Sequence, residues 1–123
     1  MRMENNLIEE YLGDWYNLLD NNKGTRSLMI LPNPKSIKLA DLEGTFNYSA
    51  TTKVIGTDCG DRLYIRSCDE INHDGVVRLA GFSFERIYII DDGVLSEKTL
   101  AILRSRLRSP LGIDCKMYIN GKD

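Results

Sequence analysis

The chain has little of what catalytic and metal centres usually require. Histidine occurs once among 123 residues, and the three cysteines form no C-x-x-C pair. A lone histidine leaves few routes to acid–base chemistry near neutral pH, and unpaired cysteines argue against structural zinc. The sequence therefore predicts no metal and no cofactor, and an enzyme is the least favoured of the functions considered.

Long hydrophobic runs and an excess of positive charge are also absent. No apolar stretch approaches the roughly 20 residues of a transmembrane helix. Lysine and arginine total 16 against 18 acidic residues, for a net charge of -2, which disfavours nucleic acid as a partner. Acidic residues stand near the N-terminus, where a secretory signal needs an apolar core. We expect a cytoplasmic protein with reduced thiols, no membrane contact, and a small molecule or another protein as its partner, in an oligomeric state left open.

Hydrophobic residues make up 42% of the sequence and charged residues 28%, as in a folded soluble domain. The length predicts a single domain over residues 1–123. Apolar residues at helical spacing predict a helix over residues 4–12, which Gly13 is expected to end. Short runs separated by turn residues then predict strands at 15–19, 27–31, 42–49, 53–55, 62–68, 76–90 and 113–119.

These short strands predict an all-β fold, a small antiparallel up-and-down barrel with a short N-terminal helix, because closure removes exposed sheet edges. Residues 96–110 fit two structures. As a helix, the segment is capped by Ser96 and has its leucines on one face. As a strand, it has its arginines facing outward. The β-rich surroundings favour the strand, and an α+β domain with a helix at 96–109 is the alternative.

The tripeptide Gly13-Asp14-Trp15 follows the predicted helix and begins the first predicted strand. A short helix followed by Gly-x-Trp resembles the calycin superfamily of lipocalins, fatty-acid-binding proteins and avidins. Three pieces resemble avidins in order: Gly13 with Trp15 and Asn17, residues 44–48 (GTFNY) and residues 112–114 (GID). The resemblance implies a barrel whose closed end is plugged by the tryptophan. Two hydroxyl positions of the avidin site are aromatic here, so biotin binding is not expected.

The first functional hypothesis is a non-enzymatic binding module, a small β-barrel that holds a small ligand near its tryptophan. Asn17 would supply the polar contact and the aromatic side chains the stacking surface. The predicted ligand-binding residues are Trp15, Asn17, Phe46 and Tyr48.

The alternative is a protein-interaction module of the inhibitor or immunity type, acting through a basic surface stripe. Arg104, Arg106 and Arg108 alternate in the sequence and would line one strand face. The same arginines could equally form a solvated outer face that protects an edge strand.

Two acidic turns are the remaining candidates for a site. Asp69, Glu70, His73 and Asp74 lie within six residues, but their spacing matches no defined ligand pattern and predicts a solvated turn. Residues 56–62 (GTDCGDR) lack the ligand series of an EF-hand and predict a tight turn.

Overall fold

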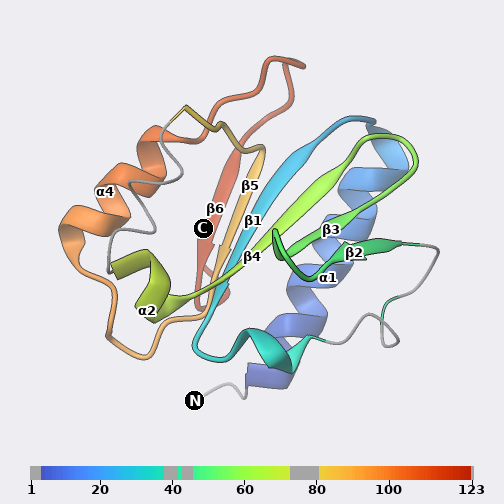
Figure 1. Ribbon diagram of the computed structural model, residues 1–123. Helices are drawn as coiled ribbons and strands as arrows, with labels where there is room; N and C mark the ends of the chain where they lie inside the picture. Colours follow the sequence, from blue (N-terminus) through green and yellow to red (C-terminus); the bar gives the residue numbers. More distant parts are fainter. Residues whose placement is uncertain (1–3, 38–41, 43–45, 73–80, 123) are drawn as a thin grey trace.

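The computed structural model describes residues 4–37, 42, 46–72 and 81–122. Its sheet is open and has the strand order β2-β3-β4-β1-β5-β6 (Figure 1). The strands are β1 (Arg26–Leu31), β2 (Asn47–Ser49), β3 (Val54–Gly56), β4 (Arg62–Ser67), β5 (Arg86–Ile89) and β6 (Lys116–Ile119).

Most of the sheet is parallel. β1 pairs in parallel with β4 and with β5, and β5 pairs in parallel with β6. Among the strands of the described part, β2, β3 and β4 are joined by antiparallel pairs. The predicted antiparallel barrel is therefore wrong: the protein has an open, mixed α/β sheet with helices on its faces.

Helices cover the two faces of the sheet, and each face has its own hydrophobic core. Helix α1 (Glu4–Asn21) lies on one face, and α2 (Cys68–Glu70) and α4 (Glu97–Ser105) lie on the other (Figure 1). A short 3-10 helix, η1 (Pro34–Ser36), follows β1. None of the helices in the described part of the chain is long and apolar enough to cross a membrane.

Strand β1 lies at the centre of both cores. Leu28, Met29, Ile30 and Leu31 are each 0% exposed, and alternate side chains pack against opposite helical layers. Such an unbroken apolar run is typical of a strand with parallel neighbours and both faces covered.

Helix α1 continues through Gly13, so the predicted helix end at Gly13 and the predicted strand at 15–19 are both wrong. Gly13 is exposed, and a Cβ added there would meet no atom within 4 Å. A glycine in a helix costs about 1 kcal/mol relative to alanine. The two turns beyond it bury Trp15 and Leu18, and that burial outweighs the cost.

The tripeptide that suggested a barrel instead fastens α1 to the sheet. Asp14 accepts a hydrogen bond of 2.7 Å from the hydroxyl of Tyr88 and one of 3.3 Å from Nε of Arg86. Trp15 is 0% exposed and packs in the core between α1 and the sheet. Both residues position the helix, and Trp15 is buried as expected, although not in a barrel.

The segment 96–110 contains a helix, so the favoured strand is wrong and the helical alternative describes it over Glu97–Ser105. Ser96 is the N-cap, and its Oγ accepts a hydrogen bond of 3.1 Å from the backbone N–H of Thr99. Leu103 is fully buried against the sheet. Capping and one buried face outweigh the alternation that favoured a strand.

Other predicted strands fare better. Those at 27–31 and 62–68 match β1 and β4 to within one residue, and β3 begins one residue later than predicted. In the expected range 42–49 the described strand is Asn47–Ser49, and residues 43–45 lie outside the described residues. In the range 113–119 the strand is Lys116–Ile119. In the range 76–90 the described strand is Arg86–Ile89, and residues 73–80 lie outside the described residues.

Replacing Trp15 tests the core between α1 and the sheet. Trp15→Ala should lower the free energy of unfolding by roughly 3–5 kcal/mol, as in other large-to-small core substitutions. Trp15→Phe should cost less, because most of the apolar volume remains. The indole Nε1 also has no hydrogen-bond partner among the described residues, so phenylalanine loses no such bond. Urea denaturation followed by circular dichroism measures both free energies of unfolding.

Asn17→Ala, on the exposed side of α1, is the control. A loss for Trp15→Ala no larger than that of the control would contradict this packing.

Candidate functional site

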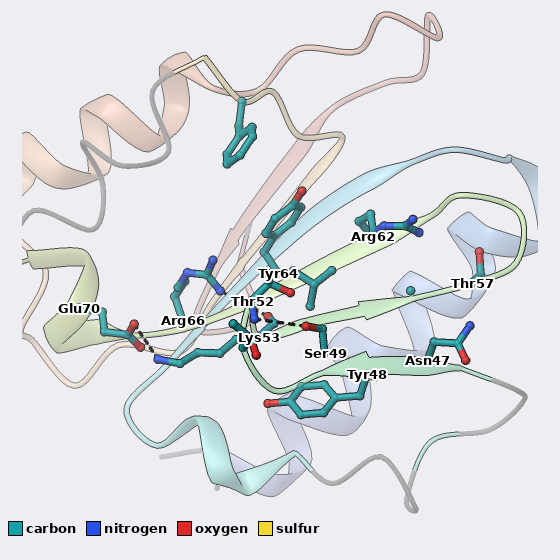
Figure 2. Close-up of a pocket in the computed structure, with 14 residues that line it drawn as sticks. Asn47, Tyr48, Ser49, Thr52, Lys53, Thr57, Arg62, Tyr64, Arg66 and Glu70 are labelled. Atoms are coloured by element: carbon teal, nitrogen blue, oxygen red, sulfur yellow. Dashed lines mark hydrogen bonds and ion pairs between the residues drawn. The ribbon is translucent and has the colours of Figure 1, made fainter.

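Where the sheet extends beyond α2 and α4, one of its faces forms an open groove. The groove has a volume of about 820 Å³ and lies over β2, β3 and β4 (Figure 2). The opposite face of the same strands packs against α1 through Ile55, Leu63 and Ile65. The groove is lined by Asn47, Tyr48, Ser49, Thr51, Thr52, Lys53, Val54, Gly56, Thr57, Arg62, Tyr64, Arg66, Glu70 and Phe82.

Strand β4 supplies the centre of the groove. Arg62, Tyr64 and Arg66 alternate with buried residues, so all three side chains project from the groove face (Figure 2). Alternate residues of a strand are about 6.7 Å apart, which separates the two arginine positions by roughly 13 Å. The groove therefore presents a cation, an aromatic ring and a second cation in a line.

Each of the two guanidinium groups is held by one of its nitrogens. Nη1 of Arg62 donates to the carbonyl of Asp61 at 2.8 Å. Nη1 of Arg66 donates to the carbonyl of Ile65 at 2.7 Å and to that of Lys53 at 3.3 Å. Among the described residues, these bonds use Nη1 alone, which leaves the Nε–Nη2 edge of each group for an anion. A guanidinium fork of this kind binds a carboxylate or phosphate through two parallel hydrogen bonds.

Aromatic rings form the wall between the groove and the start of β5. The ring centroid of Tyr64 lies 5.5 Å from that of Phe82 and 5.8 Å from that of Phe84. Guanidinium carbons lie over two of these rings, that of Arg66 at 5.8 Å from Tyr64 and that of Arg26 at 5.9 Å from Phe82. These cation–π contacts hold both arginines in place. Arg26 thereby adds a further positive charge beside the groove.

Lys53 and Glu70 form an ion pair at one end of the groove, with Nζ and Oε2 2.9 Å apart (Figure 2). Burial raises the pKa of Glu70, but hydrogen bonds from Lys53 and Ser67 outweigh it, so the pKa is lowered overall. Glu70 also completes a capping box with Ser67 at the start of α2. Both residues of the pair also line a second hollow of about 550 Å³, which has Pro34 and Ile37 in its wall.

Lys53 has a strained backbone, with φ at 55° in the left-handed region. Its carbonyl accepts hydrogen bonds from the backbone N–H of Ile65, at 3.0 Å, and from Arg66. A non-glycine residue in this region costs on the order of 1 kcal/mol. The strained turn thus places the cation of Lys53 at the end of the groove, and its carbonyl helps to fix the cation of Arg66.

The four predicted ligand-binding residues do not form one site. The rings of Trp15 and Phe46 are 5.3 Å apart, on the α1 face of the sheet. Asn17 is exposed on α1. Tyr48 is 48% exposed on β2 and pairs with Ile55, so its side chain lies on the α1 side of the sheet, at the edge of the groove and of the second hollow.

The three predicted partner-binding arginines lie at the end of α4 rather than on a strand. Arg104 is in its last turn, Arg106 is its C-cap and Arg108 follows. The backbone of Arg106 and Arg108 forms hydrogen bonds of 2.8 and 3.3 Å with Phe84. Cations are stabilising at a helix C-terminus, so part of this charge complements the helix dipole. A partner-binding role for these residues stays a prediction.

The acidic turns have local structural roles. Asp61 is 2% exposed, and its Oδ1 accepts hydrogen bonds from the N–H and the hydroxyl of Thr25, at 2.8 and 2.7 Å. Its other oxygen accepts one from the hydroxyl of Thr57, so this carboxylate fixes a tight turn, as predicted. His73 and Asp74 lie outside the described residues. In the described part, no three His, Cys, Asp or Glu side chains are arranged to hold a metal ion.

The buried thiol of Cys68 is poorly suited to nucleophilic chemistry. It is 3% exposed, and its Sγ donates to the carbonyl of Ile90 at 3.3 Å. Burial, with the nearby charges of Asp91, Asp92 and Asp69, raises its pKa to about 12. Because the thiolate is the nucleophile, this thiol is unreactive near neutral pH.

No known protein family matches the chain, and no curated protein matches it. A solved structure that does match is the large terminase from a thermophilic bacteriophage, with a TM-score of 0.61 and 9% sequence identity. The match covers 88% of this chain and 29% of the terminase chain, so this chain spans less than a third of that protein's length. At this identity the likeness shows the fold alone. It agrees with the mixed, mostly parallel sheet and overturns the calycin resemblance.

The raised pKa of Cys68 predicts loss of stability in alkaline solution. Above the ordinary pKa of 9.0 the unfolded chain loses the thiol proton, while the folded chain keeps it until about pH 12. The free energy of unfolding should therefore fall by up to about 1.4 kcal/mol per pH unit from this group. Burial and the hydrogen bond to Asp14 also raise the pKa of Tyr88, which adds to the fall at higher pH.

Urea denaturation at a series of pH values measures this slope. Cys68→Ala is expected to be less stable than the parent at neutral pH and to lose stability less steeply above pH 9.0. Equal slopes in the two proteins would show that Cys68 does not titrate as described.

Proposed function

We propose that the protein is a non-enzymatic binding module that holds an anionic segment of a partner in the groove over β2, β3 and β4. The observation that carries this proposal is the line of Arg62, Tyr64 and Arg66, with one edge of each guanidinium left for an anion. Two such forks attract an anionic ligand by charge, and their paired hydrogen bonds also fix its orientation.

Charge distribution supports the same proposal. The whole chain has a net charge of -2, yet the side chains lining the groove include three cations and one carboxylate. The carboxylate belongs to Glu70, which is paired with Lys53. A local excess of one sign in a hollow attracts the opposite charge even when the molecule as a whole does not.

The small-ligand hypothesis is less well supported. The Trp15 side chain is 0% exposed, and the two hollows at the β2–β3 end are not lined by it. The protein-interaction hypothesis fits better once its basic surface is moved from α4 to β4. We keep a cytoplasmic location as part of the proposal, since the described cysteines are all free thiols.

Charge reversal in the groove tests the proposal. The probes are fluorescently labelled poly-L-glutamate and a labelled single-stranded oligothymidylate, followed by fluorescence anisotropy at low and at physiological salt. At least one probe should bind, more weakly as salt rises. The double variant Arg62→Glu/Arg66→Glu should weaken that binding by about tenfold or more, or roughly 1.4 kcal/mol.

A matched control is available on α4. Arg104→Glu/Arg108→Glu changes the net charge by the same amount at two exposed positions. Its binding should stay within about threefold of the parent, because only the overall charge changes. An equal loss in both double variants, or no binding of either probe by the parent, would refute the groove as the site.

A further inference from the structure

We infer that the occupant of the groove is an extended acidic segment of a protein, with two carboxylates four residues apart and an apolar residue midway between them. This inference rests on the proposed function and names the class of its partner. Three observations support it: the order of side chains on β4, the guanidinium groups that lie over the aromatic rings, and the ion pair between Lys53 and Glu70.

The spacing on β4 matches that of another extended chain. Arg62, Tyr64 and Arg66 occupy alternate positions, so the cations are roughly 13 Å apart with a ring midway. An extended segment laid along β4 repeats at the same distance. Carboxylates at its first and fifth positions therefore face the two guanidinium groups, and the side chain at its third position faces Tyr64. The pattern is symmetric, so either chain direction satisfies it.

The free guanidinium edges suit carboxylates in number as well as position. Arg62 and Arg66 are held through Nη1 to main-chain carbonyls, which fixes the forks before a ligand arrives. Lys53 is already paired with Glu70 at 2.9 Å, so it offers less to a ligand. Two strong anion positions, rather than a continuous row of them, are typical of a protein segment with isolated acidic side chains.

Single-stranded nucleic acid fits the groove less well. Such ligands stack their bases on free aromatic faces. Here guanidinium groups cover Tyr64 and Phe82, at 5.8 and 5.9 Å, and the two rings also contact each other. Glu70 would face a backbone that carries a negative charge at every nucleotide. Stacking of a base on the covered ring faces would require the arginines to leave their ring contacts, whereas an apolar side chain can pack against a ring edge.

The rest of the lining suits a peptide main chain. Ser49, Thr51 and Thr52 place neutral hydroxyl groups along the hairpin side of the groove, whereas the hydroxyl of Thr57 already donates to Asp61. A hydroxyl donates and accepts hydrogen bonds, so it can serve both the N–H and the C=O groups of an extended segment. Polyphosphate chains offer acceptors but few donors, and would use these hydroxyls only in part.

The test compares labelled peptides of identical composition by fluorescence anisotropy. One contains Glu-Ser-Leu-Ser-Glu within a glycine–serine background, and the other contains Glu-Glu-Ser-Leu-Ser in the same background. A third replaces both glutamates by glutamine, and an oligothymidylate of similar length represents nucleic acid. The first peptide should bind at least about fivefold more tightly than the second, since only its acids reach both forks. The glutamine peptide should show no measurable binding.

A charge exchange identifies the contact. Arg66→Glu should weaken binding of the first peptide, and a peptide in which one of its two glutamates is lysine should recover affinity for this variant by about fivefold or more. Rescue supports a direct pair between the groove and the peptide.

Three results would overturn the inference. Equal affinity for the two glutamate peptides would remove the spacing requirement while leaving an anion-binding groove. Tighter, salt-dependent binding of the oligothymidylate would change the partner to nucleic acid and would also leave the proposed function standing. Failure of all these probes and of poly-L-glutamate would refute the proposed function together with the inference.

Discussion

The parallel pairing of β1 with both β4 and β5 determines where the other elements lie. A strand paired on both edges and buried from Ser27 to Leu31 needs a layer on each face, and α1, α2 and α4 supply these layers. Two buried carboxylates hold its start: Asp61 accepts the N–H of Thr25 at 2.8 Å, and Glu85 accepts that of Arg26 at 2.7 Å. The helices on the α4 side cover the central strands and leave the hairpin strands open. The basic groove is the part of the sheet that this arrangement leaves uncovered.

Local patterns predicted the central strands well and the first helix poorly. The apolar run of β1 and the alternation of β4 are both direct consequences of burial, so they could be read from the sequence. The end of α1 could not. Gly13 is a helix breaker by propensity, and only the tertiary contacts of Trp15 and Leu18 show that the helix continues. The segment around Arg104 was ambiguous because it contains both the leucine spacing of a helix and the alternation of a strand. Only its packing against the sheet decides between them.

The groove was only half visible in the sequence. Arg62 and Arg66 stand out as the polar side of an alternating strand, but alternation does not say whether a face is covered or open. Phe82 and Glu70 join the site from segments on either side of residues 73–80, through tertiary packing that no spacing rule gives. Tyr48 was selected for its ring, by analogy with a barrel, and its side chain lies on the α1 side of the sheet, at the edge of the groove.

The central position of β1 in the sheet also affects how the chain folds while it is being synthesised. Its parallel partners, β4 and β5, both come later in the chain, the second of them nearly sixty residues after β1 begins: Ser27 pairs with Arg86. A ribosome adds residues at about 5–20 per second, so both edges of the most apolar strand wait on the order of seconds for their partners. The chain preceding β1 is α1, whose buried face fits the same strand and is available first. Early docking of α1 onto β1 would shield one face of that strand during synthesis. Its unpaired edges would stay open to aggregation until β4 and β5 are made, unless a chaperone covers them.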